Sequence, residues 1–282
     1  LSSQLLQAVR VLMGIRWEVL TVHPSGGGPT FDAVLVMPPP NLDGGPAPLI
    51  VCPHGGPHSN YGARFDDTST FWLSQGFALL FPNYRGSIGF GKAALDSLLG
   101  NVGTQDIADV MDSIEAARSN PHVDFDRMVI MGGSHGGFIG AHLVAQHADA
   151  FRAAALRNPV INIASMATTT DIPDWCRVEA GLPHDLSKPP TPEEAAAMHA
   201  VSPIVHATNI KAPVLLLIGV KDLRVPPAQG MELHAALAAS GVDTAVMHYD
   251  DSHPLMSVTV EADVAISVLR WFRKALGLDV SE

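Results

Sequence analysis

Short apolar runs alternate with longer amphipathic segments along most of this chain. Six runs are too short to be helices and are expected to be strands, at residues 49–52, 77–81, 128–131, 153–156, 214–218 and 245–248. Apolar residues at helical spacing mark residues 67–75, 105–118, 136–147, 227–239 and 261–276. Strands connected by helices pair in parallel, and helices cover both faces of such a sheet. The pattern predicts one α/β domain with a mainly parallel central sheet over the whole chain, residues 1–282.

Three other segments depart from this alternation. Residues 17–22 and 31–37 flank the glycine-rich stretch 25–29, which predicts a leading antiparallel hairpin. Residues 168–207 form an irregular insertion that can cover a site, with a helix beginning at residues 189–194, where Thr191 or a neighbour is the cap and Pro192 lies in the first turn. Residues 1–16 are expected to be a linker or an interdomain helix.

Composition narrows the classes of partner. The 282 residues include 17 Lys and Arg against 28 Asp and Glu, giving a formal charge of −11, whereas a nucleic-acid surface needs clustered basic side chains. The longest apolar stretch, residues 212–220, is far shorter than the ~20 residues that span a bilayer. The two cysteines form neither a disulfide framework nor a four-ligand zinc site. We expect a cytoplasmic protein in a reducing setting that binds neither nucleic acid nor membrane.

The first candidate for chemistry is a serine at a glycine-rich turn. In residues 128–138 (MVIMGGSHGGF) an apolar strand runs into Gly132-x-Ser134-x-Gly136 and then into a helical pattern. This context is typical of the nucleophile elbow of the α/β-hydrolase fold. The glycines permit a sharp, strained turn, and a helix that begins at His135 can stabilise an oxyanion. We predict that Ser134 is the nucleophile; the alternative is a structural turn with an idle serine.

In this fold the catalytic acid follows the serine along the chain, and the histidine follows the acid. Asp222 follows the strand 214–218, and His253 follows the strand 245–248. Open α/β sheets place functional groups at the carboxyl ends of their strands. We therefore predict that Asp222 orients the imidazole of His253, which acts as the base.

Other acidic and histidine residues are weaker candidates. Asp250 and Asp251 lie too near His253 in sequence to come from another strand end, so they are kept as alternates and interpreted as solvated loop carboxylates. His248 lies within a strand pattern and is interpreted as a packed or edge residue. No strand precedes the remaining histidines considered, His199, His206 and His234.

A second glycine pair follows the strand 49–52, in His54-Gly55-Gly56-Pro57-His58. Small residues there let backbone amides approach a substrate carbonyl. We predict an oxyanion hole formed by the N–H groups of Gly56 and His135, since proline has no N–H. A metal site at His54 and His58 is rejected, because Gly-Gly-Pro cannot form the intervening helical turn. Residues 83–87 would lie beside the same edge, either as a buried structural loop or as part of the site.

Together these residues resemble the catalytic domain of the acylaminoacyl peptidases (acylpeptide hydrolases), within the prolyl oligopeptidase family. The resemblance covers most of the chain from residue 48 onward. It implies the same three catalytic residues and adds Arg224 as the donor to the substrate carbonyl before the scissile residue. It also implies a homo-oligomer and an amino-terminal β-propeller; because the sequence has no tract of repeated short strands, we expect the propeller to be absent from this chain. The matching segments are residues 54–59, 83–91, 100–103, 131–138, 157–166, 170–176 and 222–226.

The resulting hypothesis is a cofactor-independent serine hydrolase that releases an N-acyl amino acid from acylated peptides through an acyl-enzyme. A carboxylesterase or lipase on the same fold is one alternative, because the three residues alone do not distinguish esters from amides. A non-catalytic binding domain with an idle triad is the other. An N-acylated peptide is the expected substrate.

Overall fold

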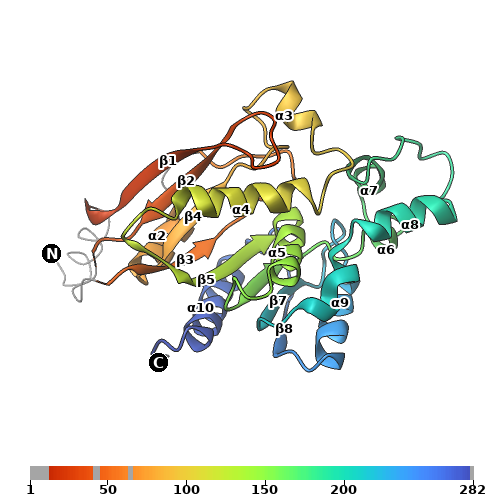
Figure 1. Ribbon diagram of the computed structural model, residues 1–282. Coiled ribbons are helices and arrows are strands. Elements are labelled where there is room, and N and C mark those ends of the chain that lie inside the picture. Colours follow the sequence, from red (N-terminus) through yellow and green to blue (C-terminus); the bar gives the residue numbers. More distant parts are fainter. Residues whose placement is uncertain (1–12, 41–44, 63–65, 280–282) are drawn as a thin grey trace.

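An eight-stranded sheet forms the centre of the protein (Figure 1). The computed structural model describes residues 13–40, 45–62 and 66–279. The strand order is β1-β2-β4-β3-β5-β6-β7-β8; β1 pairs antiparallel with β2, β2 pairs antiparallel with β4, and all other pairs are parallel. The α/β-hydrolase fold and the leading hairpin are thus confirmed. The strands are β1 (Arg16–Val22), β2 (Phe31–Met37), β3 (Ala47–Val51), β4 (Ala78–Pro82), β5 (Val123–Gly133), β6 (Ala154–Arg157), β7 (Val214–Gly219) and β8 (Thr244–Tyr249).

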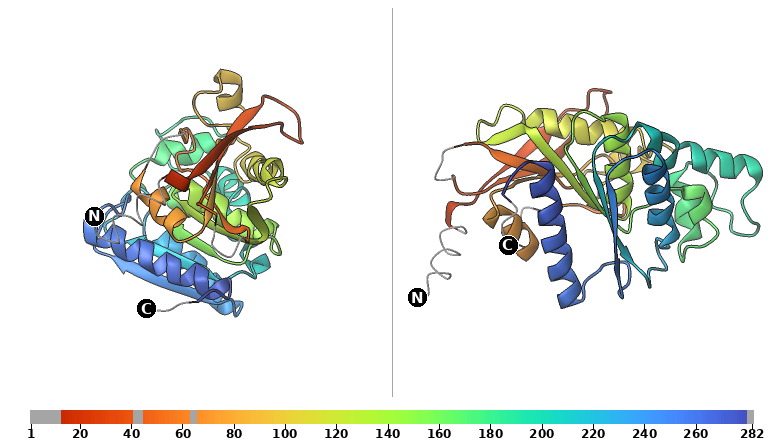
Figure 2. Two further views of the ribbon diagram at one scale, coloured as in Figure 1. Left: turned by 90° about the vertical axis from the view of Figure 1, so that its left-hand side faces the viewer. Right: turned by 90° about the horizontal axis from the view of Figure 1, so that it is seen from below.

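Helices cover both faces of the sheet, as predicted. On one face lie α4 (Gln105–Ala117), α5 (His135–Gln146) and α9 (Ala228–Ala239); on the other lie α2 (Asp67–Ser74) and α10 (Val258–Ala275) (Figure 2). Alternate residues of the buried strands enter the two resulting cores, because successive side chains of a strand point to opposite faces. Leu49 and Val51 belong to the α4 and α5 side, while Ile50 belongs to the α2 and α10 side.

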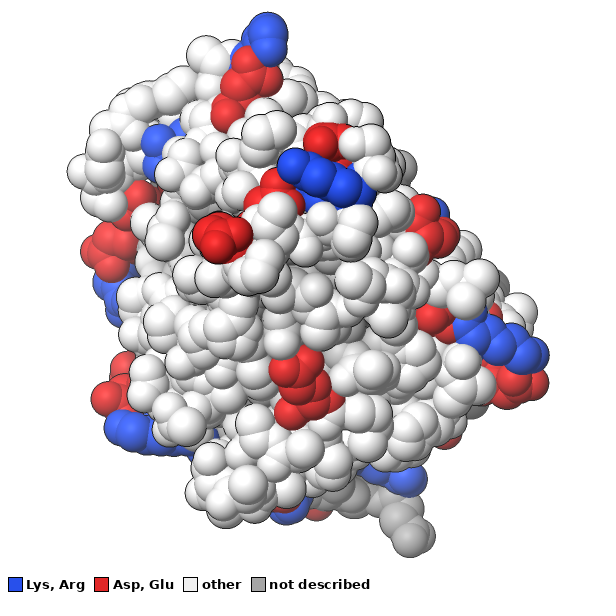
Figure 3. Space-filling model, turned by 90° about the vertical axis from the view of Figure 1, so that its right-hand side faces the viewer, with Lys and Arg blue, Asp and Glu red and all other residues white. Residues whose placement is uncertain are grey.

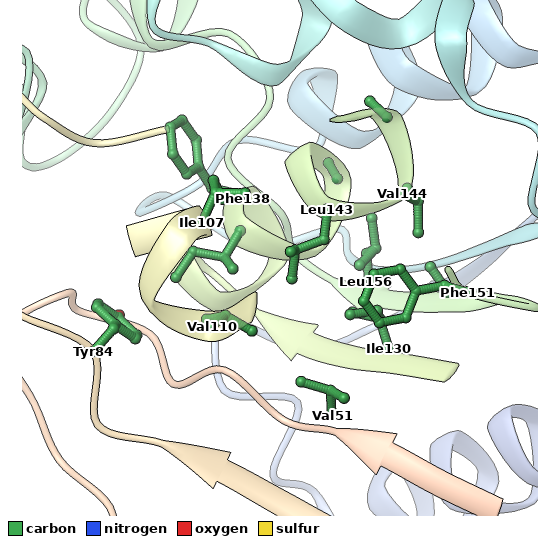
Figure 4. Close-up of a cluster of buried hydrophobic side chains, with 14 of the residues drawn as sticks. Val51, Tyr84, Ile107, Val110, Ile130, Phe138, Leu143, Val144, Phe151 and Leu156 are labelled. Atoms are coloured by element: carbon green, nitrogen blue, oxygen red, sulfur yellow. The ribbon is translucent and has the colours of Figure 1, made fainter. Parts of the chain in front are cut away.

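The larger core explains why the strands are continuous apolar runs. Val51, Ile130 and Leu156 come from three neighbouring strands and pack beneath α4 and α5 (Figure 4). All three side chains are fully buried. Burial of such aliphatic side chains stabilises the fold by about 1.5–3 kcal/mol each. The central strands are therefore fixed by packing from above and below.

The insertion is more regular than expected. The predicted helix is present as α8 (Pro192–Ala200), and Thr191 caps it in a reciprocal arrangement with Glu194. The same region also contains α7 (Pro173–Glu179) and a 3-10 helix (Pro203–Asn209), which the pattern did not predict because each is short. Two other short helices, α3 (Lys92–Asp96) and α6 (Ile163–Met166), were also not predicted.

The two ends of the molecule differ from the central sheet. Most of the segment 1–16, expected to be a linker or helix, lies outside the described residues, and Arg16 already belongs to β1. The end of the molecule that carries the insertion is largely uncharged, with acidic and basic side chains in small mixed groups (Figure 3). In the described part of the chain, no helix combines the length and the apolar character needed to cross a membrane.

Candidate active site

The serine elbow joins β5 to α5. Ser134 has φ 57° and ψ −124°, a conformation that residues other than glycine rarely adopt. Its backbone is held from both sides: its N–H donates to the carbonyl of Arg157 at 3.0 Å, and its carbonyl accepts from the N–H groups of Phe138 and Val160 at 3.0 and 3.3 Å. These bonds stabilise the strained turn. The side chain of Ser134 consequently stands at the carboxyl end of the sheet.

The glycines of the elbow are required by close backbone contacts. A Cβ at Gly132 would lie 2.2 Å from the carbonyl oxygen of Gly136, and a Cβ at Gly136 would lie 2.3 Å from the carbonyl oxygen of Pro53. Neither obstacle is a flexible side chain. The turn therefore tolerates no side chain at these two positions.

Gly132→Ala is expected to lower the free energy of unfolding by about 1–3 kcal/mol or more, because the new methyl group collides with backbone. The measurement is urea denaturation of the variant beside the wild type. Gly26→Ala is the matched control, since a Cβ there meets nothing within 4 Å. Equal stability of the two variants would contradict the steric account of the elbow.

Asp222 and His253 are in direct contact. Oδ2 of the buried Asp222 lies 2.6 Å from Nδ1 of His253. The other oxygen, Oδ1, accepts the backbone N–H groups of Arg224 at 2.8 Å and Val225 at 3.0 Å. A carboxylate only accepts hydrogen bonds, so Nδ1 carries a proton, and the lone pair of the neutral ring is then at Nε2. The arrangement suits a histidine that receives a proton at Nε2.

Asn158 connects the loops of the serine and the histidine. Its side chain donates to the carbonyl of His253 at 2.9 Å and accepts the N–H of Gly219 at 2.8 Å. The preceding residue, Arg157, holds the Ser134 N–H and also donates from Nη1 to the carbonyl of Pro254 at 3.1 Å. Asn158 adopts φ +42°, which asparagine tolerates better than most residues. This role was not predicted from the sequence; the available signal was the position of Asn158 directly after a strand.

Ser134 and the His253 loop are thus tied to the adjacent residues Arg157 and Asn158, and no hydrogen bond joins the side chains of Ser134 and His253. Among the described residues, the hydroxyl of Ser134 has no hydrogen-bond partner. His253 retains a quarter of its side-chain exposure. Catalytic hydrogen bonds between serine and histidine often tighten only when substrate binds. The structure thus brings Asp222 and His253 together and leaves the serine hydroxyl unbonded.

The glycine loop after β3 lies against the elbow. A Cβ on Gly55 would be 3.2 Å from Cβ of Ser134 and 3.8 Å from the backbone nitrogen of His135. Gly56 has φ +119°, which glycine alone adopts readily. In the described residues, the N–H groups of Gly56 and His135 have no acceptor. One unpaired donor thus follows Ser134 directly and the other lies in the loop that touches Ser134, which is the supply of donors that an oxyanion hole needs.

The two histidines of this loop have separate partners. Nε2 of His54 lies 2.8 Å from Oγ of Ser87, and burial lowers its pKa to about 4, so the ring is neutral near pH 7. Nε2 of His58 faces Glu179 at 3.2 Å and its Nδ1 faces the carbonyl of Gly86 at 2.7 Å; the hydrogen bond to Glu179 raises the pKa of His58. Residues 83–87 therefore support this loop, because Ser87 and Gly86 hydrogen-bond to its two histidines. The described residues contain no cluster of three or more side chains suited to hold a metal ion.

Arg224 lies beside the acid in a two-point ion pair. Its Nε and Nη2 donate to the carboxylate of Asp171 at 2.8 and 3.3 Å. This pairing raises the pKa of the guanidinium, and the side chain remains about half exposed. The remaining N–H groups can still donate to another acceptor. Asp171 was not among the site residues predicted from the sequence.

The alternate acidic candidates have partners other than Asp222 and His253. Asp250 pairs with Lys221 at 2.7 Å, and Asp251 accepts backbone N–H groups of Ser252 and Ser257. His248 is exposed on the edge strand β8.

A buried pair that was not predicted from the sequence supports the elbow. Nε2 of His135 lies 3.0 Å from Oδ2 of Asp106.

Comparisons with known proteins identify the family of this chain. The model of the prolyl oligopeptidase family matches residues 63–279. The acylamino-acid-releasing enzyme of Rattus norvegicus is 41% identical over 280 residues, covering 96% of this chain and 38% of the relative; that of Arabidopsis thaliana is 43% identical over 229 residues, covering 80% and 30%. The chain thus spans less than half the length of these relatives.

Solved structures share the fold. An acylaminoacyl peptidase of Pyrococcus horikoshii superposes with a TM-score of 0.83 at 23% identity, covering 95% of this chain and 43% of that one. A puromycin-hydrolysing peptidase of Mycobacterium tuberculosis gives a TM-score of 0.81 at 27% identity, covering 94% and 40%.

Proposed function

Since this chain belongs to the prolyl oligopeptidase family, we propose that it is the catalytic domain of a serine peptidase that releases N-acyl amino acids from acylated peptides. The observation that carries the proposal is the 2.6 Å contact between His253 and Asp222 beside the Ser134 elbow. The likeness to acylamino-acid-releasing enzymes supports the choice of substrate class.

In the proposed mechanism, Oγ of Ser134 attacks the carbonyl carbon of the first residue while Nε2 of His253 takes the hydroxyl proton. Asp222 holds the imidazole tautomer and stabilises its positive charge. The protonated histidine then gives the proton to the leaving amine, which departs and leaves an acyl-enzyme. Water, activated in the same way, releases the N-acyl amino acid. The chemistry is complete without a cofactor.

The N–H groups of Gly56 and His135 stabilise the tetrahedral oxyanion in this mechanism. Loss of one such donor costs about 3–4 kcal/mol of barrier lowering. Arg224 would donate to the carbonyl of the acyl group, while Asp171 keeps its planar fork in one orientation. The acyl group is thus recognised by its oxygen rather than by charge.

The proposal extends to the arrangement of the whole protein. We place the peptidase domain in this chain and treat the part of residues 1–16 that precedes β1 as the linker to a β-propeller, within a homo-oligomer. The support is the family resemblance together with the 38% of the relatives' length that the chain spans. A reducing, cytoplasmic setting fits Cys52 and Cys176, which are both unpaired and buried.

Substrate comparison tests the proposed activity. The purified chain is expected to hydrolyse acetyl-alanyl p-nitroanilide with a kcat/KM about 10- to 100-fold above that for free alanyl p-nitroanilide, because a charged amine replaces the acceptor that Arg224 would bind. Efficient hydrolysis of p-nitrophenyl butyrate with no anilide turnover would indicate an esterase instead. Absence of both turnover and fluorophosphonate labelling would indicate a binding domain.

A further inference from the structure

Helix α7 of the insertion holds the glycine loop at two points. Nε1 of Trp175 donates to the carbonyl oxygen of Gly56 at 2.8 Å, across 119 residues of sequence. One turn later, the buried carboxylate of Glu179 faces Nε2 of His58 at 3.2 Å. A short helix remote in sequence thus anchors both halves of the loop that carries Gly56.

Trp175 also contacts the other proposed oxyanion donor. Its ring meets the ring of His135 edge-on, with centroids 5.9 Å apart and an interplanar angle of 71°. The His135 ring is fixed from the remaining sides by stacking on Phe138 at 4.9 Å and by its bond to Asp106. One indole therefore touches both residues whose N–H groups would bind the oxyanion.

We propose that Trp175 is a positioning residue that sets the geometry of the oxyanion hole; this inference rests on the proposed function. Gly56 has no side chain to restrict its backbone, and its φ of +119° is one of several conformations that glycine adopts readily. Fixing the Gly56 carbonyl removes rotations that would turn the N–H of the same residue away from Ser134. Preorganised donors stabilise the transition state because they need no reorientation during the reaction.

The same segment reaches the proposed acyl site. Asp171 binds the guanidinium of Arg224, and Oγ1 of Thr170 donates to the carbonyl of Arg224 at 2.6 Å. Residues 170–175 therefore connect Arg224 with the glycine loop. Residues 170–176 resemble the family but take no part in the proposed triad. These contacts give the segment a positioning role.

The experiment removes the indole N–H. Trp175→Phe keeps an aromatic ring beside His135 and is expected to lower kcat for acetyl-alanyl p-nitroanilide about 10- to 100-fold, with KM within about 3-fold of the wild-type value. Acetyl-alanine boronic acid, which forms a tetrahedral adduct with the serine, is expected to bind more weakly by the same factor as kcat/KM. Binding of the product N-acetylalanine is expected to be unchanged.

Trp271→Phe is the matched control, because within the described chain the indole N–H of Trp271 is buried without a hydrogen-bond partner. Thermal unfolding identifies any variant that does not fold, and Trp175→Met, which keeps apolar bulk without a donor, then replaces the phenylalanine variant. Equal kcat values for the Trp175 and Trp271 variants would overturn the inference. So would a loss confined to KM. No anilide turnover by the wild type would instead overturn the proposed function, so the two failures are distinguishable.

Discussion

Ser134→Ala is expected to lower kcat for acetyl-alanyl p-nitroanilide on the order of 10⁶-fold, because no other group at the elbow can form the acyl-enzyme. Fluorophosphonate labelling is expected to disappear with turnover, since both need the same oxygen. Folding should be unaffected, as the Ser134 hydroxyl has no hydrogen-bond partner among the described residues. Steady-state kinetics and intact-mass measurement of the labelled protein provide the two readouts.

A serine far from the elbow serves as the control for this prediction. Ser240 follows α9, is exposed, and its hydroxyl bonds only to the carbonyl of Ala236 among the described residues. Ser240→Ala should retain wild-type turnover and labelling. Labelling of the Ser134 variant at full stoichiometry would reject Ser134 as the nucleophile.

Asp222→Asn is expected to lower kcat by about 10⁴-fold while the protein stays folded. The amide oxygen can continue to accept the N–H groups of Arg224 and Val225, which directs the amide NH₂ toward His253. Nδ1 of His253 must then act as an acceptor, so Nε2 carries the proton and cannot receive another from the serine. The result is a histidine in the wrong tautomer, detectable by the NMR shifts of its ring nitrogens.

Asp251→Asn tests whether any nearby carboxylate would serve. Asp251 lies two residues before His253 in sequence, and its carboxylate accepts hydrogen bonds from the backbone and the hydroxyls of Ser252 and Ser257. We expect its replacement to change kcat by less than about 3-fold, as is usual for a loop side chain away from the reacting groups. An equal loss in both variants would remove Asp222 from its assigned role.

The framework of the site was accessible from the sequence because it depends on strong local signals. Buried parallel strands give continuous apolar runs, and functional loops follow their carboxyl ends. That rule selected Asp222 and His253, which are 31 positions apart in sequence. In the structure, Oδ2 of Asp222 lies 2.6 Å from Nδ1 of His253. The elbow was recognisable because its turn excludes side chains at Gly132 and Gly136.

The supporting contacts were not accessible, because each joins residues distant in sequence. Helix α7 has only seven residues, too few for an apolar period to identify it, and its contacts with Gly56 and His58 are tertiary. Asn158 has no motif of its own; its importance comes from the carbonyl and N–H groups that two other strands bring to it. Local patterning carries no information about such bonds.

The Asn158 bridge restricts how the proposed active site can open. Residues 157 and 158 tie the Ser134 turn and the His253 loop to a single point on the sheet edge. Moving one relative to the other would require deforming the junction of β6 and β7. The 168–207 insertion is tied to the same rim through Trp175 and Asp171, so displacing it would carry the Gly56 loop and the Arg224 side chain with it.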